Sequence, residues 1–513
     1  METRSGDDVG RALDMTLSRR SALRSISAGM LGAAAALGGQ ARGTAAPARV
    51  AARSVQAADT RPNIILLVLD DMRADDLAMM PAVQELLVAQ GTNFTNFFAT
   101  APGCAPARAS ILRGQYPHNH GVRRSDGDLG GFDRFYTLDR EQSTVATWLQ
   151  DAGYHTALIG KYLNGYQSDE FPAGASATYV PPGWDEWAGV TNESYFQLQV
   201  NENGRIVRYG GDHAYGTDVL AAKALAFVEQ AAHESEAFFL YLTPRAPHGP
   251  AEYAPRHATA FADVTAPRPP SFNEADVSDK PAWMQAIPEL TEKQIAEIDA
   301  YYVARLRTLL AVDEMVAALV ESLRRAGTLD STYILLTSDN GYHLGEHRIV
   351  RDKGSPYEES IRVPLVVRGP GVPVGQTISA LVSQVDLAPT FAAWADVAVP
   401  DFVDGRSLVP LLAGEAQLAW RQTVLIEKYI DRPKKSMKQP RFDALRGEDF
   451  TYVENFTGSR EWYDLTQDPY QVDNLVASVD ADRLEALSDR LAAMTACARE
   501  TCRTIEDAPL PPG

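Results

Sequence analysis

Carboxylate and amide side chains follow two apolar segments of the chain. Asp70 and Asp71 come directly after one apolar run, and Asp339 and Asn340 come shortly after another. Three carboxylates and one amide oxygen would suit a hard divalent cation such as Ca²⁺ or Mg²⁺. A single Asp in such a place is better explained as a turn or a helix cap. Two clusters of this kind weaken that explanation, and together they predict one metal site.

Cys104 stands in a setting that favours chemistry over simple packing. It opens a segment that reads as a helix, with Arg108 one turn further on. A helix N-terminus offers unpaired N–H groups and a positive dipole end, and an arginine presents a fork of donors. Both favour an anion. A cysteine taken alone is more often a small buried core residue, so the surrounding motif carries the functional interpretation.

The other two cysteines, Cys497 and Cys502, lie close together near the end of the chain. In an oxidising compartment they could form a small disulfide loop. Two unpaired thiols are the alternative, and the spacing allows both.

The elements that would have to position these residues indicate an α/β fold. Buried strands are predicted for five apolar runs: 63–69, 155–159, 238–242, 333–336 and 364–367. Helices are predicted for four segments: 81–90, 143–152, 217–230 and 291–326, the last with room for a break. Strands that alternate with helices are typical of a large mixed, mostly parallel sheet flanked by helices. Sites in such sheets gather at the carboxyl ends of the strands, where His248 also falls.

The pattern changes after about residue 414. Short segments at 424–428, 450–454 and 461–464 predict a small antiparallel sheet, and 482–497 predicts a closing helix. We therefore expect a larger domain over residues 61–414 and a smaller C-terminal domain over residues 415–513.

The N-terminus resembles an export signal. Arg19 and Arg20 precede a weakly apolar, small-residue stretch over 26–39, and an Ala-rich segment follows. The stretch is too short and too weak to cross a bilayer of about 30 Å. This order predicts a signal and linker over residues 1–57, and the arginine pair favours the twin-arginine route. A basic tail without such a role is the alternative. No later segment reads as membrane-spanning.

The bulk composition narrows the range of partners. The chain has 513 residues and a formal net charge of -19. An acidic surface argues against a general role on nucleic acid or on anionic lipid. It leaves room for an anionic substrate, because a small site can be positive on an acidic protein.

A family resemblance rests on motifs spread along the chain. Cys-x-Pro-x-Arg at 104–108, followed by Gly-x-Tyr-Pro at 114–117, resembles the sulfatase signature. The resemblance continues in the family's order through five further motifs: Asp70-Asp71, Gly160-Lys161, Pro247-His248-Gly249-Pro250, Asp339-Asn340-Gly341 and Asp352-Lys353-Gly354. The segments 116–120, 160–164 and 461–465 are similar to the N-acetylglucosamine-6-sulfatase branch.

The resemblance implies a role for each of these residues. In the family, a separate formylglycine-generating enzyme oxidises the cysteine to formylglycine (3-oxoalanine), here at Cys104. One divalent cation, usually Ca²⁺, would be held by five residues: Asp70, Asp71, modified Cys104, Asp339 and Asn340. Charge on the sulfuryl oxygens would be neutralised by three cations: Arg108, Lys161 and Lys353. His248, with Lys353, would supply the proton to the leaving oxygen. The expected substrate is a sulfated sugar or an aryl sulfate.

Two positions depart from the common pattern of the family. Leu163 stands where many sulfatases have a histidine, and Asn164 is a candidate to replace it. Arg113 stands where threonine is common, and it could extend the basic pocket or lie in solvent. Three further histidines near the motifs, His118, His120 and His213, are expected to be structural or to contact substrate, because a hard cation prefers oxygen ligands.

Two other functions compete with this interpretation. A phosphodiesterase or phosphonate monoester hydrolase of the same superfamily would share the motif and the shape of the substrate. A secreted glycan-binding protein with an inactive site is the second alternative. It is disfavoured, because such a protein is expected to have lost at least one of the motif residues, and all are present.

Overall fold

The computed structural model describes residues 61–166, 171–192, 194–211, 214–414, 420–429 and 439–510. The predicted export signal and His213 lie outside the described residues. Residues 415–419 do as well, so the domain boundary at this point stays a prediction. Residues Gln56–Gly513 form one compact unit.

A ten-stranded mixed sheet forms the centre of this unit, in the order β11-β2-β10-β9-β1-β8-β4-β5-β6-β7. Its strands are β1 (Asn63–Leu69), β2 (Thr92–Phe94), β4 (His155–Gly160), β5 (Glu186–Val190), β6 (Gln199–Glu202), β7 (Arg205–Arg208), β8 (Phe238–Thr243), β9 (Thr332–Ser338), β10 (Leu365–Arg368) and β11 (Gln376–Ile378). The five strands β9-β1-β8-β4-β5 run parallel. A separate short pair joins β3 (Phe97–Phe98) to β12 (Val382–Ser383). The predicted mixed, mostly parallel sheet is confirmed.

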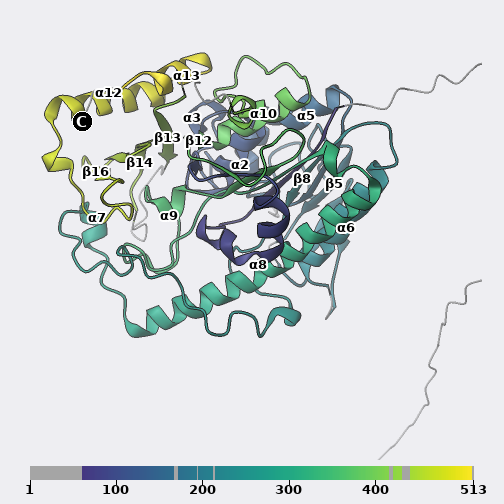
Figure 1. The fold of residues 1–513 in the computed structure, drawn as a ribbon, viewed down its shortest axis with the longest axis horizontal. Coiled ribbons are helices and arrows are strands. Elements are labelled where there is room, and N and C mark those ends of the chain that lie inside the picture. The colour runs from purple at the N-terminus through teal and green to yellow at the C-terminus, as the bar shows by residue number, and fades with distance from the viewer. Residues whose placement is uncertain are drawn as a thin grey trace, which may run out of the picture. The chain divides into compact units, whose positions relative to one another are not determined.

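The alternation of β1 explains why helices cover both faces of the sheet. Ile65, Leu67 and Leu69 belong to a core that includes residues of α6 (Gly216–Ala231) and α8 (Glu292–Ala326). The β1 residues that alternate with these three belong to a second core on the other face of the sheet. This second core includes residues of α2 (Cys104–Arg113), α5 (Val145–Asp151) and α10 (Leu387–Trp394). Both faces are buried because successive strand residues point to opposite sides. Figure 1 shows α6 and α8 side by side, away from α2, α5 and α10.

The predicted helices agree with the structure in place, with two differences in form. The segment 291–326 contains one unbroken helix of 35 residues, Glu292–Ala326, capped by Thr291, so the break that the sequence allowed is absent. The segment 81–90 is interrupted, with α1 (Pro81–Val83) followed by a π-helical turn, η2 (Gln84–Val88). Short helices complete the set: α3 (Pro117–His120), α4 (Gly131–Thr137), α7 (Ala282–Gln285), α9 (Glu358–Ile361) and α11 (Val409–Leu412). Single 3-10 turns are η1 (Asp75–Met79), η3 (Arg140–Gln142), η4 (Pro255–His257), η5 (Leu329–Ser331), η6 (Gln384–Asp386) and η7 (Val476–Ser478).

The C-terminal part carries a four-stranded antiparallel sheet, in the order β13-β14-β15-β16. Its strands are β13 (Thr423–Lys428), β14 (Phe442–Gly447), β15 (Phe450–Asn455) and β16 (Arg460–Asp464). Two helices, α12 (Ala481–Ala496) and α13 (Glu500–Asp507), follow it (Figure 1). The antiparallel sheet and closing helix are confirmed, but β14 was missed. Within the described ranges, no helix is both long and apolar enough for a membrane span.

Candidate active site

Four neighbouring parallel strands deliver the polar side chains to one edge of the sheet. β1 ends directly before Asp70, β9 ends before Asp339, and β4 ends before Lys161. The loop after β8 carries His248. Since β9, β1, β8 and β4 lie next to one another and run parallel, their carboxyl ends meet. The structure thus brings together residues that lie up to 269 positions apart in the sequence, from Asp70 to Asp339.

Three buried aspartates and one buried cysteine form the centre of the site. The ligand atoms of Asp70, Asp71, Cys104 and Asp339 all lie within 4.8 Å of one another. Cys104 Sγ is 3.4 Å from Asp70 Oδ1. Asn340 joins them, because its Nδ2 donates to Asp71 Oδ1 at 2.7 Å. Four oxygen-bearing side chains around one thiol position are the donor set of a hard divalent cation.

Three cations surround this centre. Arg108 Nε donates to Asp339 Oδ2 at 2.8 Å, and Lys161 Nζ donates to Asp70 Oδ2 at 2.7 Å. Lys353 Nζ donates to an oxygen of Asp71 and lies 2.7 Å from Cys104 Sγ. All of the residues predicted to neutralise the sulfuryl charge therefore reach the same place.

One donor in this set has no acceptor. Arg108 is fully buried, and its Nη2 has no hydrogen-bond partner among the described residues. This nitrogen lies 4.0 Å from Asp70 Oδ2. Buried polar groups are nearly always hydrogen-bonded, so such an atom calls for an explanation. An oxyanion in the site would supply the missing acceptor.

The electrostatics of the site shift the pKa values of Asp70 and of the Cys104 thiol in opposite directions. Burial acts to raise the pKa of Asp70, but the charges of Lys161, His248 and Arg108 outweigh it and hold that pKa well below its ordinary value. Burial, with Asp339 next, raises the pKa of the Cys104 thiol. Asp70 is therefore charged while Cys104 stays a thiol. An unmodified Cys104 would be a poor nucleophile, because the thiolate is the reactive form.

His248 lies at the solvent side of the cluster. Its side chain is 27% exposed, and Nε2 is 3.7 Å from Asp71 Oδ2. Nδ1 lies 2.8 Å from the carbonyl oxygen of Gly249, and a proton on Nδ1 would make that hydrogen bond. Nε2 then faces the cluster as the group that can take up or deliver a proton.

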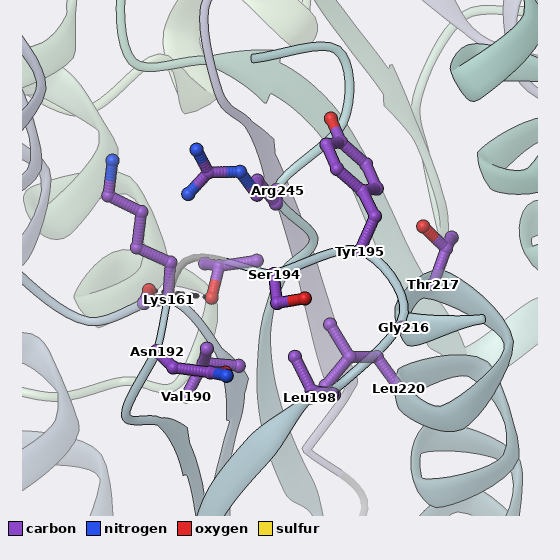
Figure 2. Close-up of a pocket in the computed structure, with 11 residues that line it drawn as sticks. Lys161, Val190, Asn192, Ser194, Tyr195, Leu198, Gly216, Thr217, Leu220 and Arg245 are labelled. Atoms are coloured by element: carbon purple, nitrogen blue, oxygen red, sulfur yellow. Dashed lines mark hydrogen bonds between the residues drawn. The ribbon is translucent and has the colours of Figure 1, made fainter. Parts of the chain in front are cut away.

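A small cavity adjoins Lys161 from the side of β5 and α6. Its volume is about 20 Å³, which is room for water and far too little for a sugar ring. Figure 2 shows the amine of Lys161 and the guanidinium of Arg245 on one side of it, with Val190, Leu198 and Leu220 on the other. The cavity therefore lies beside Lys161 and is too small to be the substrate site.

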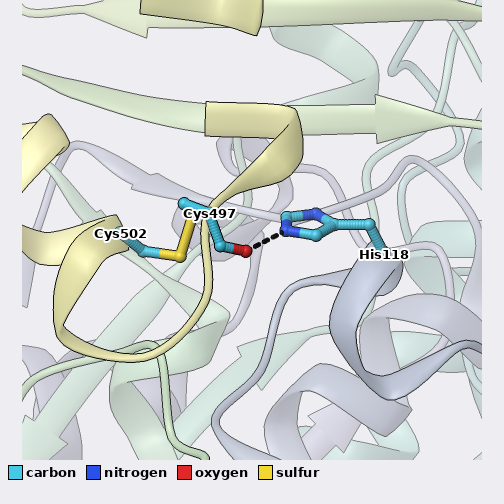
Figure 3. A group of neighbouring side chains, drawn as sticks. All are labelled: His118, Cys497 and Cys502. Atoms are coloured by element: carbon cyan, nitrogen blue, oxygen red, sulfur yellow. Dashed lines mark hydrogen bonds between the residues drawn. A yellow bond between two sulfur atoms is a disulfide. The ribbon is translucent and has the colours of Figure 1, made fainter. Parts of the chain in front are cut away.

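A second group of metal-type residues lies at the C-terminal part: His118, Cys497 and Cys502. The two cysteines form a disulfide, which settles the alternatives left open by their spacing. His118 Nδ1 lies 2.8 Å from Glu427 Oε2, and Nε2 lies 2.9 Å from the carbonyl oxygen of Cys497 (Figure 3). Both ring nitrogens and both sulfurs are engaged, so this group is structural.

The two positions that depart from the family pattern have different outcomes. Arg113 is buried, and its Nη1 donates to the carbonyl oxygens of Arg140 and Ser143 at 2.7 and 2.6 Å. Neither predicted role is correct, because the backbone of a neighbouring segment holds this arginine in the interior. Asn164 Oδ1 is buried and has no partner among the described residues. Its replacement of the histidine stays a prediction.

His120 was expected to be structural or to contact substrate, and its contacts are structural. It is buried, with Nε2 3.1 Å from Ser110 Oγ and Nδ1 accepting from the backbone N–H of Val122 at 3.1 Å.

One neighbour of the site was missed from the sequence. Arg245 Nη2 lies 3.1 Å from His248 Nδ1, and its place three residues before His248 was the available signal.

Comparisons with known proteins identify the family and support the fold. A family model described as Sulfatase matches residues 62–397, and one described as N-sulphoglucosamine sulphohydrolase, C-terminal, matches residues 345–496. The N-acetylglucosamine-6-sulfatase of Homo sapiens is 34% identical over 488 residues, which are 88% of this chain and 87% of that protein. The chain spans 57% and 34% of the lengths of two extracellular sulfatase homologues, from Caenorhabditis elegans and Drosophila melanogaster, which are 35% and 36% identical.

Solved structures share the fold. A protein in complex with its substrate D-glucosamine-2-N,6-O-disulfate is 26% identical, with a TM-score of 0.71, and the match covers 87% of this chain and 99% of that one. A phosphonate monoester hydrolase from Silicibacter pomeroyi is 23% identical, with a TM-score of 0.65 over 84% of this chain and 93% of that one. At that identity the likeness concerns the fold alone.

The ten-stranded sheet thus carries an acidic cluster at the carboxyl ends of its parallel strands. The family model covers more than half of the chain. The chain belongs to the sulfatase family, whose members are sulfuric ester hydrolases, and the resemblance seen in the sequence is confirmed.

Proposed function

We propose that this chain hydrolyses the sulfate ester of a sulfated sugar, with Cys104 in its formylglycine form at the reacting position. The observation that carries the proposal is the unpartnered donor of Arg108 beside a thiol that lies among carboxylates and cations. An oxyanion substrate satisfies the arginine, and modification replaces a thiol whose pKa is raised.

The residues of the site fit one divalent cation, which we propose to be Ca²⁺. Asp70, Asp71, Asp339 and Asn340 would hold it through oxygen, together with the modified Cys104. The three carboxylates face three cationic side chains, so their formal charges cancel. A divalent ion would leave an excess of two positive charges, which matches an anionic ester. When bound, the ion would lower the cost of negative charge on an oxygen nucleophile.

Each remaining side chain has a separate task in the proposed reaction. Formylglycine in its hydrated form would supply one hydroxyl for attack on sulfur and a second to expel sulfate. Arg108 and Lys161 bind the sulfuryl oxygens and neutralise the charge that develops on them. Lys353, which contacts Cys104 Sγ, orients the reacting position. His248 Nε2 delivers the proton to the leaving oxygen of the sugar.

The relatives favour sulfate over phosphate, and they favour a glucosamine sugar. Those that match most of the chain at 34% identity are named N-acetylglucosamine-6-sulfatase. The solved neighbour at 26% identity binds a disulfated glucosamine. The phosphonate monoester hydrolase shares the fold alone. We therefore propose a 6-sulfated glucosamine as the reacting sugar and keep the phosphodiester as the control substrate.

We propose that the protein works outside the cytoplasm. The disulfide between Cys497 and Cys502 suits an oxidising compartment. The basic, apolar and small-residue order of the first 57 residues supports export, with the twin-arginine route as the specific expectation. Two relatives are named extracellular sulfatases.

The test combines mass spectrometry with a substrate panel. Protein made together with a formylglycine-generating enzyme is digested, and the tryptic peptide ending at Arg108 is weighed. We expect an aldehyde at Cys104 and turnover of glucosamine 6-sulfate and of 4-nitrophenyl sulfate, with little turnover of an aryl phosphodiester. The Cys104→Ala variant is expected to be inactive. Full activity of protein that carries a thiol at Cys104 would overturn the mechanism, and a preference for the phosphodiester would overturn the substrate.

A further inference from the structure

Arg305 is a fully buried arginine in the middle of α8, and the proposed reaction gives it no task. Its ion pair is with Asp76, whose Oδ2 lies 3.4 Å from Nη2. Its Nε has no hydrogen-bond partner among the described residues. Taking a charge out of water costs free energy unless good partners replace the water. The loose pair with Asp76 is a weak reason to bury an arginine, so the other contacts of the guanidinium group have to account for its position.

Both terminal nitrogens of Arg305 donate to backbone carbonyl oxygens of the active-site loops. Nη2 donates to the carbonyl oxygen of Asp71 at 2.5 Å, and Nη1 donates to that of Pro247 at the longer distance of 3.4 Å. Asp71 is a proposed metal ligand, and Pro247 directly precedes His248. The two loops lie side by side, because a β-bridge pairs Asp70 with Pro247. One planar group therefore contacts both the metal loop and the loop of the proton donor.

The backbone has to turn at Asp71 for two successive aspartates to share one site. In a continued strand, the side chains of Asp70 and Asp71 would point to opposite faces of the sheet. Instead, Asp71 has a φ of 68°, in the left-handed region that a residue with a side chain adopts only at a cost in free energy. Both carboxylates then reach the site around Cys104. The carbonyl oxygen of Asp71 is costly to bury unpaired, and Arg305 supplies a donor to it.

The helix α8 and two tyrosine rings hold the guanidinium group in place. α8 is 35 residues long, is capped by Thr291 and contributes to the core on one face of the sheet. The guanidinium carbon of Arg305 lies 4.7 Å from the ring centre of Tyr342 and 5.9 Å from that of Tyr301. A planar fork that is already fixed loses less entropy for each hydrogen bond that it forms. A lysine at this place would offer a compact ammonium group, which cannot serve two carbonyl oxygens with the same geometry.

We propose that Arg305 is a positioning residue, which holds the metal-ligand turn at Asp71 and the loop of His248 in one fixed relation through their backbone. This inference rests on the proposed function and deepens it. Groups behind a metal ligand orient that ligand, and their loss typically weakens ion binding or activity by about 10- to 100-fold. Loss of Arg305 should therefore weaken ion binding and proton delivery together, although every ligand and His248 itself remain.

The first measurement is ion binding without substrate. Arg305→Lys keeps a cation beside Asp76, so the variant is expected to fold, and thermal unfolding checks this. Each protein is stripped of metal with a chelator and then titrated with Ca²⁺ in a calorimeter. We expect the dissociation constant for Ca²⁺ to rise about tenfold in Arg305→Lys.

The second measurement compares two leaving groups at saturating Ca²⁺. Phenyl sulfate releases a more basic phenolate than 4-nitrophenyl sulfate does, so its turnover depends more on the proton that His248 delivers. We expect kcat of Arg305→Lys to fall about tenfold for phenyl sulfate and clearly less for 4-nitrophenyl sulfate. A smaller folded fraction would lower both rates by the same factor, so the ratio of the two rates separates positioning from folding.

Arg307→Lys is the matched control. Arg307 lies on the same helix and also donates to a backbone carbonyl oxygen, that of Ala260 at 2.8 Å, and its guanidinium carbon lies 4.9 Å from the ring centre of Tyr253. This variant should keep the wild-type ion affinity and the wild-type ratio of rates. Wild-type values of both in Arg305→Lys would overturn the inference. So would a change in only one of them, because Arg305 would then hold one loop and not both.

The calorimetry separates this inference from the proposed function. If the wild-type protein cleaves no sulfate ester, the proposed function fails. The Ca²⁺ affinities of the wild type, Arg305→Lys and Arg307→Lys are measured without any ester, so they still decide whether Arg305 holds the metal-ligand turn. If the wild-type protein cleaves the esters but binds no Ca²⁺, the ion assignment fails, and the ratio of rates decides the role of Arg305 at the loop of His248.

Discussion

Two groups of side chains among the described residues have the composition of a metal site, and their atoms are engaged in different ways. Asp70, Asp71, Cys104 and Asp339 bring four ligand atoms together near the carboxyl ends of parallel strands, and their contacts are with cationic side chains and an amide. In the second group, around His118, the two sulfurs form a disulfide. The ring nitrogens of His118 lie within hydrogen-bond distance of Glu427 and of the backbone of Cys497.

The difference lies in what each atom already binds. A histidine between a carboxylate and a carbonyl oxygen contributes to stability, because its hydrogen bonds join α3 to the C-terminal part. A carboxylate surrounded by Lys161, Arg108 and Lys353 is held in its charged form and is ready to bind a cation. The comparison therefore predicts activity losses for changes in the first group and stability losses for changes in the second.

The largest effect is expected for Asp339→Ala. The change removes a proposed metal ligand and the partner of Arg108 Nε, and it leaves the remaining carboxylates to repel one another. We expect the bound ion to be lost and turnover of 4-nitrophenyl sulfate to fall at least about a thousandfold. Elemental analysis and kinetics measure the two. An ion content at the wild-type level would contradict the assignment of Asp339 as a ligand.

A smaller effect is expected for the double change Cys497→Ser and Cys502→Ser. The disulfide closes a short loop, with a sequence separation of 5, so its loss should lower the free energy of unfolding by about 2 kcal/mol. Chemical denaturation measures this, with the reduced wild-type protein as a second reference. Ion content and kcat should stay unchanged. A lost ion in the double variant would mean that the two groups are coupled.

The smallest effect is expected for His118→Gln, and it should depend on pH. Burial acts to lower the pKa of His118, but Glu427 outweighs it and raises that pKa. A raised pKa in the folded protein stabilises it fully below about pH 6.5, the ordinary value of histidine, and the contribution is lost as pH rises through the folded pKa. The stability difference from wild type should be about 1 kcal/mol near pH 5.5 and shrink by pH 9. A difference that grows with pH would refute the ion pair.

The strands of the large sheet and the polar residues at their ends could be predicted from the sequence, because short local patterns of residues determine them. Unbroken apolar runs such as Asn63–Leu69 define buried strands, and polar residues directly after them define strand ends. Once the strands are parallel neighbours, the ends must meet. The helix that begins at Cys104 was readable for the same reason, since its motif sets both the start of the helix and the position of Arg108.

The remaining features depend on partners that are distant in sequence. β14 does not alternate cleanly, and its pairing with β13 and β15 fixes it as a strand. Arg113 is buried because two carbonyl oxygens 27 and 30 residues away accept from it. α8 continues through the buried Arg305 because Asp76 and the carbonyl oxygen of Asp71 lie opposite. A single sequence does not display such partners.

The burial of Cys104 has a consequence for how active protein is made. In the folded chain this residue is 2% exposed and sits at the start of a buried helix, so a second enzyme has no access to it. Under the proposed function, Cys104 must therefore be oxidised before the chain folds. The active fraction of a preparation is then set by the rate of oxidation relative to the rate of folding. A variant that folds faster would be expected to yield more protein and less activity per molecule.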